Sequence, residues 1–199
     1  MEINLSILTE LALTTVYFLT AVFTAVAIEE FFTPPPALQP CKKRGRRLFS
    51  YIAIWTLTIF PATIALCKAC EIVSKAMGFN LPEQQIKLIL QSPTVEPTTK
   101  AILLVFVLLS QPLLEEAVFR RYLFRNILRV KVIKPTVAMI LSGVLFAVVH
   151  QNVLVFLPLW FLGSAIAWLY YKTGTLIAPI IAHCLFNLIN VILLFVITQ

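Results

Sequence analysis

The sequence predicts an all-α polytopic membrane protein of about six transmembrane helices, with a core of four helices that encloses a polar cavity. Three observations predict this class. The 199 residues are 60% hydrophobic and only 13% charged, whereas a soluble domain carries roughly 25% charged residues. Apolar runs long enough to span a bilayer recur along the chain. Basic residues gather at the ends of these runs, so the net charge of +7 indicates membrane topology and not nucleic-acid binding.

The first apolar run, residues 5–28, predicts a retained first helix and not a secretory signal peptide. Glu2 stands where a signal peptide carries basic residues, and the run is longer than the apolar region of such a peptide. Three consecutive prolines at 34–36 then end the helix. The loop 41–47 that follows holds five basic residues, which are the strongest topology signal in the chain.

Five further helices follow, each an apolar run that ends at prolines, basic residues or a polar break: 48–73, 100–131, 135–150, 153–171 and 176–199. Pro61 lies inside the first of these and can kink it. The polar residues 150–152 divide an apolar stretch that is too long for a single span. Residues 86–90 indicate a short segment in the membrane interface. We treat residues 1–199 as a single integral membrane domain.

The charge distribution predicts an orientation. Basic loops at 41–47, at 120–134 and around Lys172 follow the first, third and fifth predicted helices, so all three lie on one side of the membrane. The positive-inside rule makes that side cytoplasmic and puts both termini on the other side. The compact chain suggests a protein of a prokaryotic inner membrane.

The stretch around Glu115 and Glu116 carries the first chemical signal. In a helix, Glu116 and Arg120 stand one turn apart in the favourable order, acid before base. Glu115 is rotated by about 100° from Glu116, and Phe119 occupies its i+4 position. We therefore expect Glu116 to be paired and Glu115 to be available. An unpaired carboxylate near lipid costs roughly 2.5–3.5 kcal/mol, so Glu115 indicates a functional site.

The two histidines of the chain, His150 and His183, also lie in apolar surroundings. Asn187 follows His183 by one helical turn and therefore shares its face. The third and fourth predicted helices form a hairpin in which Glu115 and His150 are equally far, about 25 Å, from the turn. We expect Glu115, His150, His183 and Asn187 to converge on one polar cavity within the membrane.

This set of residues suits hydrolysis of a peptide bond. A carboxylate with an imidazole activates water, and a second imidazole with an amide offers donors to an oxyanion. The chain lacks a GxSxG motif and an HExxH motif, which disfavours a serine mechanism and a zinc protease of that type. Glu115, His150 and His183 are an alternative set of zinc ligands. We favour a reaction without a metal, because Asn187 is a poor zinc ligand but a good oxyanion donor.

Three motifs occur in order on the predicted membrane helices: EExxxR at 115–120, FxxxH at 146–150 and HxxxN at 183–187. In these motifs the sequence resembles the CAAX-protease and bacteriocin-processing family of intramembrane endopeptidases, known as CPBP or ABI. The likeness covers about residues 100–190, which it identifies as a CPBP-like catalytic core.

The resemblance implies a role for each motif. Glu115 and His150 would activate the water, and His183 with Asn187 would bind the oxyanion. The supporting residues would be Glu116, Arg120 and Phe146. The implied substrate is a membrane-associated protein or peptide within the lipid bilayer. Two other functions also fit the residues: a transporter or proton relay, and a non-catalytic immunity or scaffold protein that keeps the motifs.

The predicted orientation can be tested at the basic loop 41–47. We expect a cysteine that replaces Arg46 to react with a membrane-impermeant thiol reagent from the cytoplasmic side, because this loop is the most basic of the chain. Labelling of that cysteine from the periplasmic side alone would contradict the predicted orientation.

Overall fold

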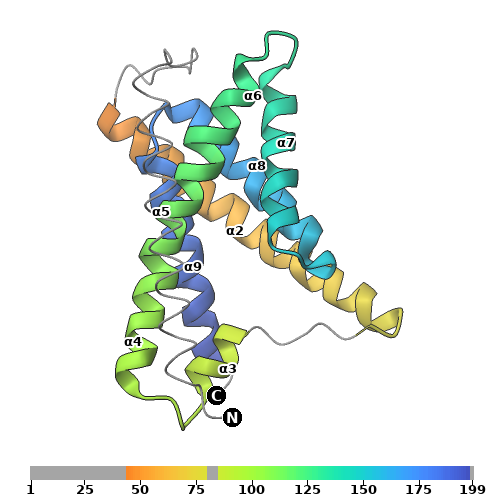
Figure 1. Cartoon of the computed structure of the whole chain (residues 1–199), viewed down its shortest axis with the longest axis vertical. Helices are drawn as coiled ribbons and strands as arrows, with labels where there is room; N and C mark the ends of the chain where they lie inside the picture. The colour runs from red at the N-terminus through yellow and green to blue at the C-terminus, as the bar shows by residue number, and fades with distance from the viewer. Residues whose placement is uncertain (1–43, 80–84, 198–199) are drawn as a thin grey trace.

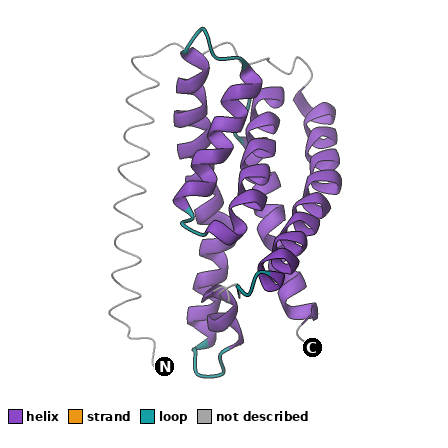
Figure 2. Ribbon diagram, turned by 90° about the vertical axis from the view of Figure 1, so that its right-hand side faces the viewer, coloured by secondary structure: helices purple, strands orange, loops and turns teal. Residues whose placement is uncertain are grey.

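The computed structural model describes residues 44–79 and 85–197, and within these residues the chain is helical and contains no strand (Figure 1). The predicted all-α class is therefore confirmed. Figure 2 shows the described helices gathered into one bundle, with loops at both ends. The predicted helix 5–28 lies outside the described residues, as does the first part of the basic loop 41–47.

Helix α2, Arg44–Ala76, extends beyond the predicted range 48–73 at both ends. The predicted range covers only the apolar part of the helix. Arg and Lys have a high helix propensity, so the helix continues into the charged residues at its ends. Pro61 lies inside α2 and does not end it. In Figure 1, α2 runs diagonally across the molecule. Its buried Trp55 donates a hydrogen bond from Nε1 to the carbonyl of Ala165 at 3.1 Å, which ties α2 to a later helix.

The predicted third helix spans residues 97–129, starting slightly before the expected Lys100 because Pro97 suits a first helical turn. Five segments make it up in turn: α4 (Pro97–Val105), the π-helical segment η1 (Phe106–Ser110), α5 (Gln111–Glu116), the π-helical segment η2 (Ala117–Phe124) and α6 (Arg125–Arg129). The sequence did not predict the π-helical segments. Glu115 and Glu116 end α5, between the two. Since π-helical segments frequently accompany functional sites, their position is consistent with chemistry at this pair.

Helices α7, Pro135–Val149, and α8, Phe156–Thr173, form a closely packed pair, joined through the short 3-10 segment η3, Val153–Val155. Two glycines permit the close approach of α7 to α8. A Cβ added to Gly143 would lie 2.1 Å from Ser164 Oγ and 2.6 Å from the carbonyl of Trp160. A Cβ added to Gly163 would lie 3.0 Å from Gly143 Cα. Small residues at such a crossing let two membrane helices approach backbone to backbone.

The remaining described helices are the short α3, Gln85–Gln91, and the C-terminal α9, Ile177–Ile197. Gly174 adopts a left-handed conformation, φ 65°, and ends α8 as its C-cap residue. Within the described residues, four helices are long and apolar enough to cross a membrane: Leu48–Ala76, Pro97–Arg129, Val153–Thr173 and Ile177–Val196. Pro135–Val149 is a shorter apolar helix. The chain is therefore a polytopic integral membrane protein.

The two glycines at the α7–α8 crossing provide a test of this packing. We expect Gly143→Ala to lower the melting temperature in detergent more than Gly163→Ala, because only the first new methyl group meets atoms closer than 3.0 Å, two of them backbone atoms. Overpacking of this kind costs typically about 1–3 kcal/mol. Equal melting temperatures for the two variants would contradict the close approach at Gly143.

Candidate active site

The ion pair predicted from the sequence is present and completely buried. Glu116 and Arg120 each have no exposed side-chain surface, and Arg120 Nε lies 3.0 Å from Glu116 Oε2. The two atoms are at ion-pair distance but without the angles of a hydrogen bond. Arg120 Nη2 instead donates a hydrogen bond to the carbonyl of Gly163 on α8 at 3.1 Å. The pair therefore joins the third helix to α8.

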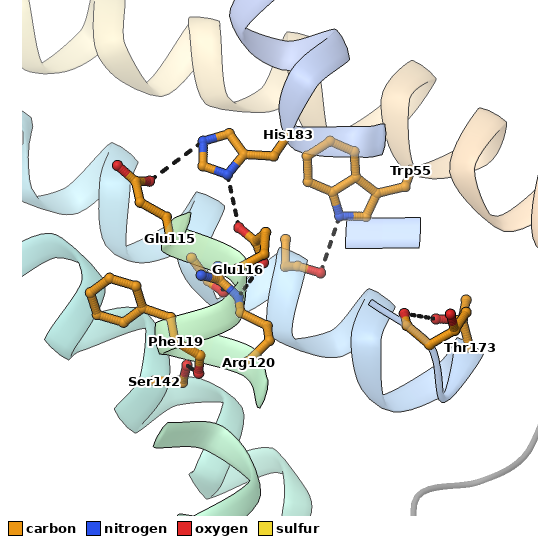
Figure 3. Close-up of polar contacts among 11 residues, drawn as sticks. Trp55, Glu115, Glu116, Phe119, Arg120, Ser142, Thr173 and His183 are labelled. Atoms are coloured by element: carbon orange, nitrogen blue, oxygen red, sulfur yellow. Dashed lines mark hydrogen bonds and ion pairs between the residues drawn. The ribbon is translucent and has the colours of Figure 1, made fainter. Parts of the chain in front are cut away.

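His183 on α9 bridges the two glutamates (Figure 3). Its Nδ1 lies 2.8 Å from Glu116 Oε1, and its Nε2 lies 3.7 Å from Glu115 Oε2. Because an ionised carboxylate only accepts hydrogen bonds, Nδ1 carries the proton in this contact. The sequence did not predict this bridge, since the spacing of HxxxN describes α9 alone and the contact joins residues 67 positions apart.

Glu115 is the more accessible of the two carboxylates. Its side chain is 17% exposed, whereas that of Glu116 is 0% exposed. Gln111, one turn earlier on α5, donates a hydrogen bond from Nε2 to Glu115 Oε1 at 2.8 Å. Gln111 was not among the predicted site residues, although its i−4 spacing from Glu115 is a signal that could have identified it. The second carboxylate oxygen of Glu115 faces His183.

His150 is the C-cap residue of α7. Its Nδ1 donates to the carbonyl of Phe146, 2.7 Å away, because a carbonyl oxygen only accepts. When the ring is neutral, Nε2 is then left as an acceptor. Gln151 follows in the left-handed conformation, φ 51°, and turns the chain into η3. In the part of the chain that the structure describes, no polar contact joins His150 to Glu115 or His183.

Asn187 lies one turn after His183 on α9, as predicted, and binds the backbone of the third helix. Its Nδ2 donates a hydrogen bond to the carbonyl of Val107 in η1 at 2.9 Å. The structure thus connects Glu115, Glu116 and His183 directly, and it holds His150 and Asn187 on backbone carbonyls. That all four predicted catalytic residues line one cavity stays a prediction.

The alternative zinc ligands are not assembled in this arrangement. Among residues 44–79 and 85–197, no group of three or more His, Cys, Asp or Glu side chains is placed to hold a metal ion. Glu115 and His183 face each other, whereas the polar contact of His150 is to its own helix.

Comparison with known proteins agrees with the motifs. A family model described as type II CAAX prenyl endopeptidase Rce1-like matches residues 97–189, which contain all three motifs. The part of the chain that holds the motifs is thus similar to the CAAX proteases. The resemblance seen in the sequence is therefore confirmed. Similarity to this family supports intramembrane protease activity and association with the lipid bilayer.

Two bacterial proteins are similar to this chain. The membrane-embedded CAAX protease MroQ of Staphylococcus aureus (strain USA300) is 29% identical over 179 residues, which cover 86% of this chain and 69% of MroQ. The UPF0177 protein YxdF of Lactococcus lactis subsp. lactis (strain IL1403) is 40% identical over 78 residues, which cover 39% of this chain and 41% of YxdF. No solved structure matches the chain.

The buried ion pair yields a stability test. We expect Glu116→Gln to lower the free energy of unfolding by about 3–5 kcal/mol, because it leaves the buried Arg120 without its counter-charge. Thermal unfolding in detergent measures the change. Glu71→Gln is the matched control, since Glu71 pairs with Lys68 and Lys75 on the surface of α2 and its loss should change stability little. Equal effects of the two substitutions would contradict the importance of the buried pair.

Proposed function

We propose that the protein is an intramembrane endopeptidase that hydrolyses a peptide bond of a membrane-associated protein or peptide. The observation that carries this proposal is the bridge of His183 between Glu115 and Glu116. One carboxylate is buried and paired with Arg120, and the other is partly accessible. The relative MroQ is itself named a membrane-embedded CAAX protease, which supports the same class of reaction.

Glu115 is the proposed general base. The 3.7 Å between Glu115 Oε2 and His183 Nε2 is too long for a direct hydrogen bond, so this carboxylate oxygen is available to accept a hydrogen bond from a catalytic water. Glu115 takes a proton from this water while the water oxygen attacks the carbonyl carbon of the substrate. His150, whose Nε2 is an acceptor, would share the activation of the water, as the family resemblance implies. Collapse of the tetrahedral intermediate then breaks the C–N bond, and the proton on Glu115 passes to the leaving amine.

His183 and Asn187 are the proposed donors to the oxyanion. Asn187 uses one Nδ2 proton on the carbonyl of Val107 and keeps the other for the substrate. Because Nδ1 carries the proton that Glu116 accepts, His183 also donates from Nε2 only when both ring nitrogens carry protons. The positive ring would then face two carboxylates, Glu115 and Glu116. Glu116 would orient His183 through Nδ1 and would not contact the substrate.

We further propose that the reaction uses no metal. A carboxylate and imidazoles activate water without a metal, and the amide of Asn187 suits an oxyanion better than it suits zinc. We expect wild-type protein that has been dialysed against a chelator, and shown by elemental analysis to lack zinc, to keep its full rate of cleavage. Loss of activity that is restored by added Zn²⁺ would contradict the proposal and favour Glu115, His150 and His183 as ligands.

The function is tested in proteoliposomes that hold the purified protein and a bacterial membrane-protein extract. We expect new peptide termini, detected by mass spectrometry, with wild type. We expect Glu115→Gln to lower their rate of formation by about 10²–10⁴-fold, since it removes the base while Glu116 and Arg120 stay paired. Glu71→Gln, remote on α2, should cleave like wild type. Absence of any cleavage that depends on Glu115 would contradict the proposed function.

A further inference from the structure

Phe146 on α7 is buried, with 1% of its surface exposed, and its ring meets the side chains of the candidate site from two other helices. The centroid of the ring lies 4.7 Å from that of His150 and 6.1 Å from that of His183. The guanidinium carbon of Arg120 lies 5.0 Å from the same ring, and the ring of Phe119 lies 5.2 Å away, edge to face. Phe146 is therefore the aromatic side chain that both histidines share.

We propose that Phe146 is a positioning residue that sets the orientation of both imidazoles, an inference that rests on the proposed peptidase reaction. Each imidazole has one short hydrogen bond at Nδ1, His150 to a carbonyl of its own helix and His183 to Glu116. One hydrogen bond fixes a ring nitrogen but leaves the ring free to tilt about it. Contact with an aromatic ring restricts the tilt, because aromatic pairs prefer defined offset or edge-to-face arrangements.

The Phe146 ring is itself held in place from its other sides. The cation of Arg120 lies over it, and Arg120 is completely buried. A Cβ added to Gly163 would come within 3.0 Å of Phe146 Cβ, which shows how closely the backbone of α8 packs against this residue. A cation above an aromatic ring and a backbone beside it both limit motion. The ring is thus a rigid surface between two groups that must be aligned for catalysis.

Phe119 provides a matched control within the same cluster. It is also buried, its ring contacts that of Phe146, and the guanidinium carbon of Arg120 lies 5.9 Å from it. No ring contact joins Phe119 to either histidine in the described part of the chain. Phe146→Leu and Phe119→Leu therefore remove the same chemical group from the same core, but only the first removes contacts with the imidazoles.

The test compares the two leucine variants in the full-length protein, with kinetics on a peptide that wild type cleaves. We expect both variants to lose some thermal stability. We expect Phe146→Leu to lower kcat by about tenfold or more with KM within about twofold, because misaligned catalytic groups slow the chemical step. Phe119→Leu should keep kcat within about twofold of wild type. Equal kcat values for the two variants in an active peptidase would overturn the inference.

A second measurement does not depend on activity. The chain has only two histidines, so selective isotope labelling of histidine, with a purification tag that contains none, observes these two rings alone. We expect the imidazole signals to broaden or split in Phe146→Leu, because the rings gain alternative orientations, and to stay single in Phe119→Leu. Single, sharp signals in both variants would overturn the positioning role even if the protein proves to have another function. If no cleavage depends on Glu115 but the signals of Phe146→Leu split, the proposed peptidase function is wrong. The positioning of the two imidazoles by Phe146 then still holds.

Discussion

The buried ion pair between Glu116 and Arg120 is the interaction on which the rest of the site depends. Neither side chain is exposed, and an uncompensated buried charge is strongly destabilising. The pair is therefore stable only where neighbouring helices supply further polar partners. The carbonyl of Gly163 on α8 and Nδ1 of His183 on α9 supply them. One carboxylate and one guanidinium thus tie three helices together and bring His183 next to Glu115.

The π-helical segments determine which way this part of the third helix faces. A π-helical turn closes its hydrogen bond one residue later than an α-helical turn and therefore changes the face on which later side chains lie. Each segment is also bound by a side chain of another helix. Val107 in η1 accepts a hydrogen bond from Asn187, and Phe119 in η2 accepts one from Ser142 at 3.4 Å. These contacts set the position of the glutamates relative to α7 and α9.

The glycine crossing of α7 and α8 has a consequence for the site as well as for the fold. Because Gly143 and Gly163 let the two backbones approach, Phe146 lies against α8 at the level where Arg120 reaches the carbonyl of Gly163. The same ring contacts both imidazoles. The same residues therefore pack α7 against α8, provide a partner for the buried charge and align the histidines. Substitutions at these residues should affect stability and catalysis together.

The sequence by itself determined the membrane class, the main helices and the motifs, because apolar run length and i+4 spacing are local properties of a chain. It also predicted the pairing of Glu116 with Arg120, which lies within one turn of one helix. Only the tertiary structure decided that His183 bridges Glu115 and Glu116, that Asn187 binds Val107, and that Phe146 contacts both histidines. These contacts cross between helices, and they depend on π-helical turns and on a glycine crossing whose geometry helical spacing does not encode.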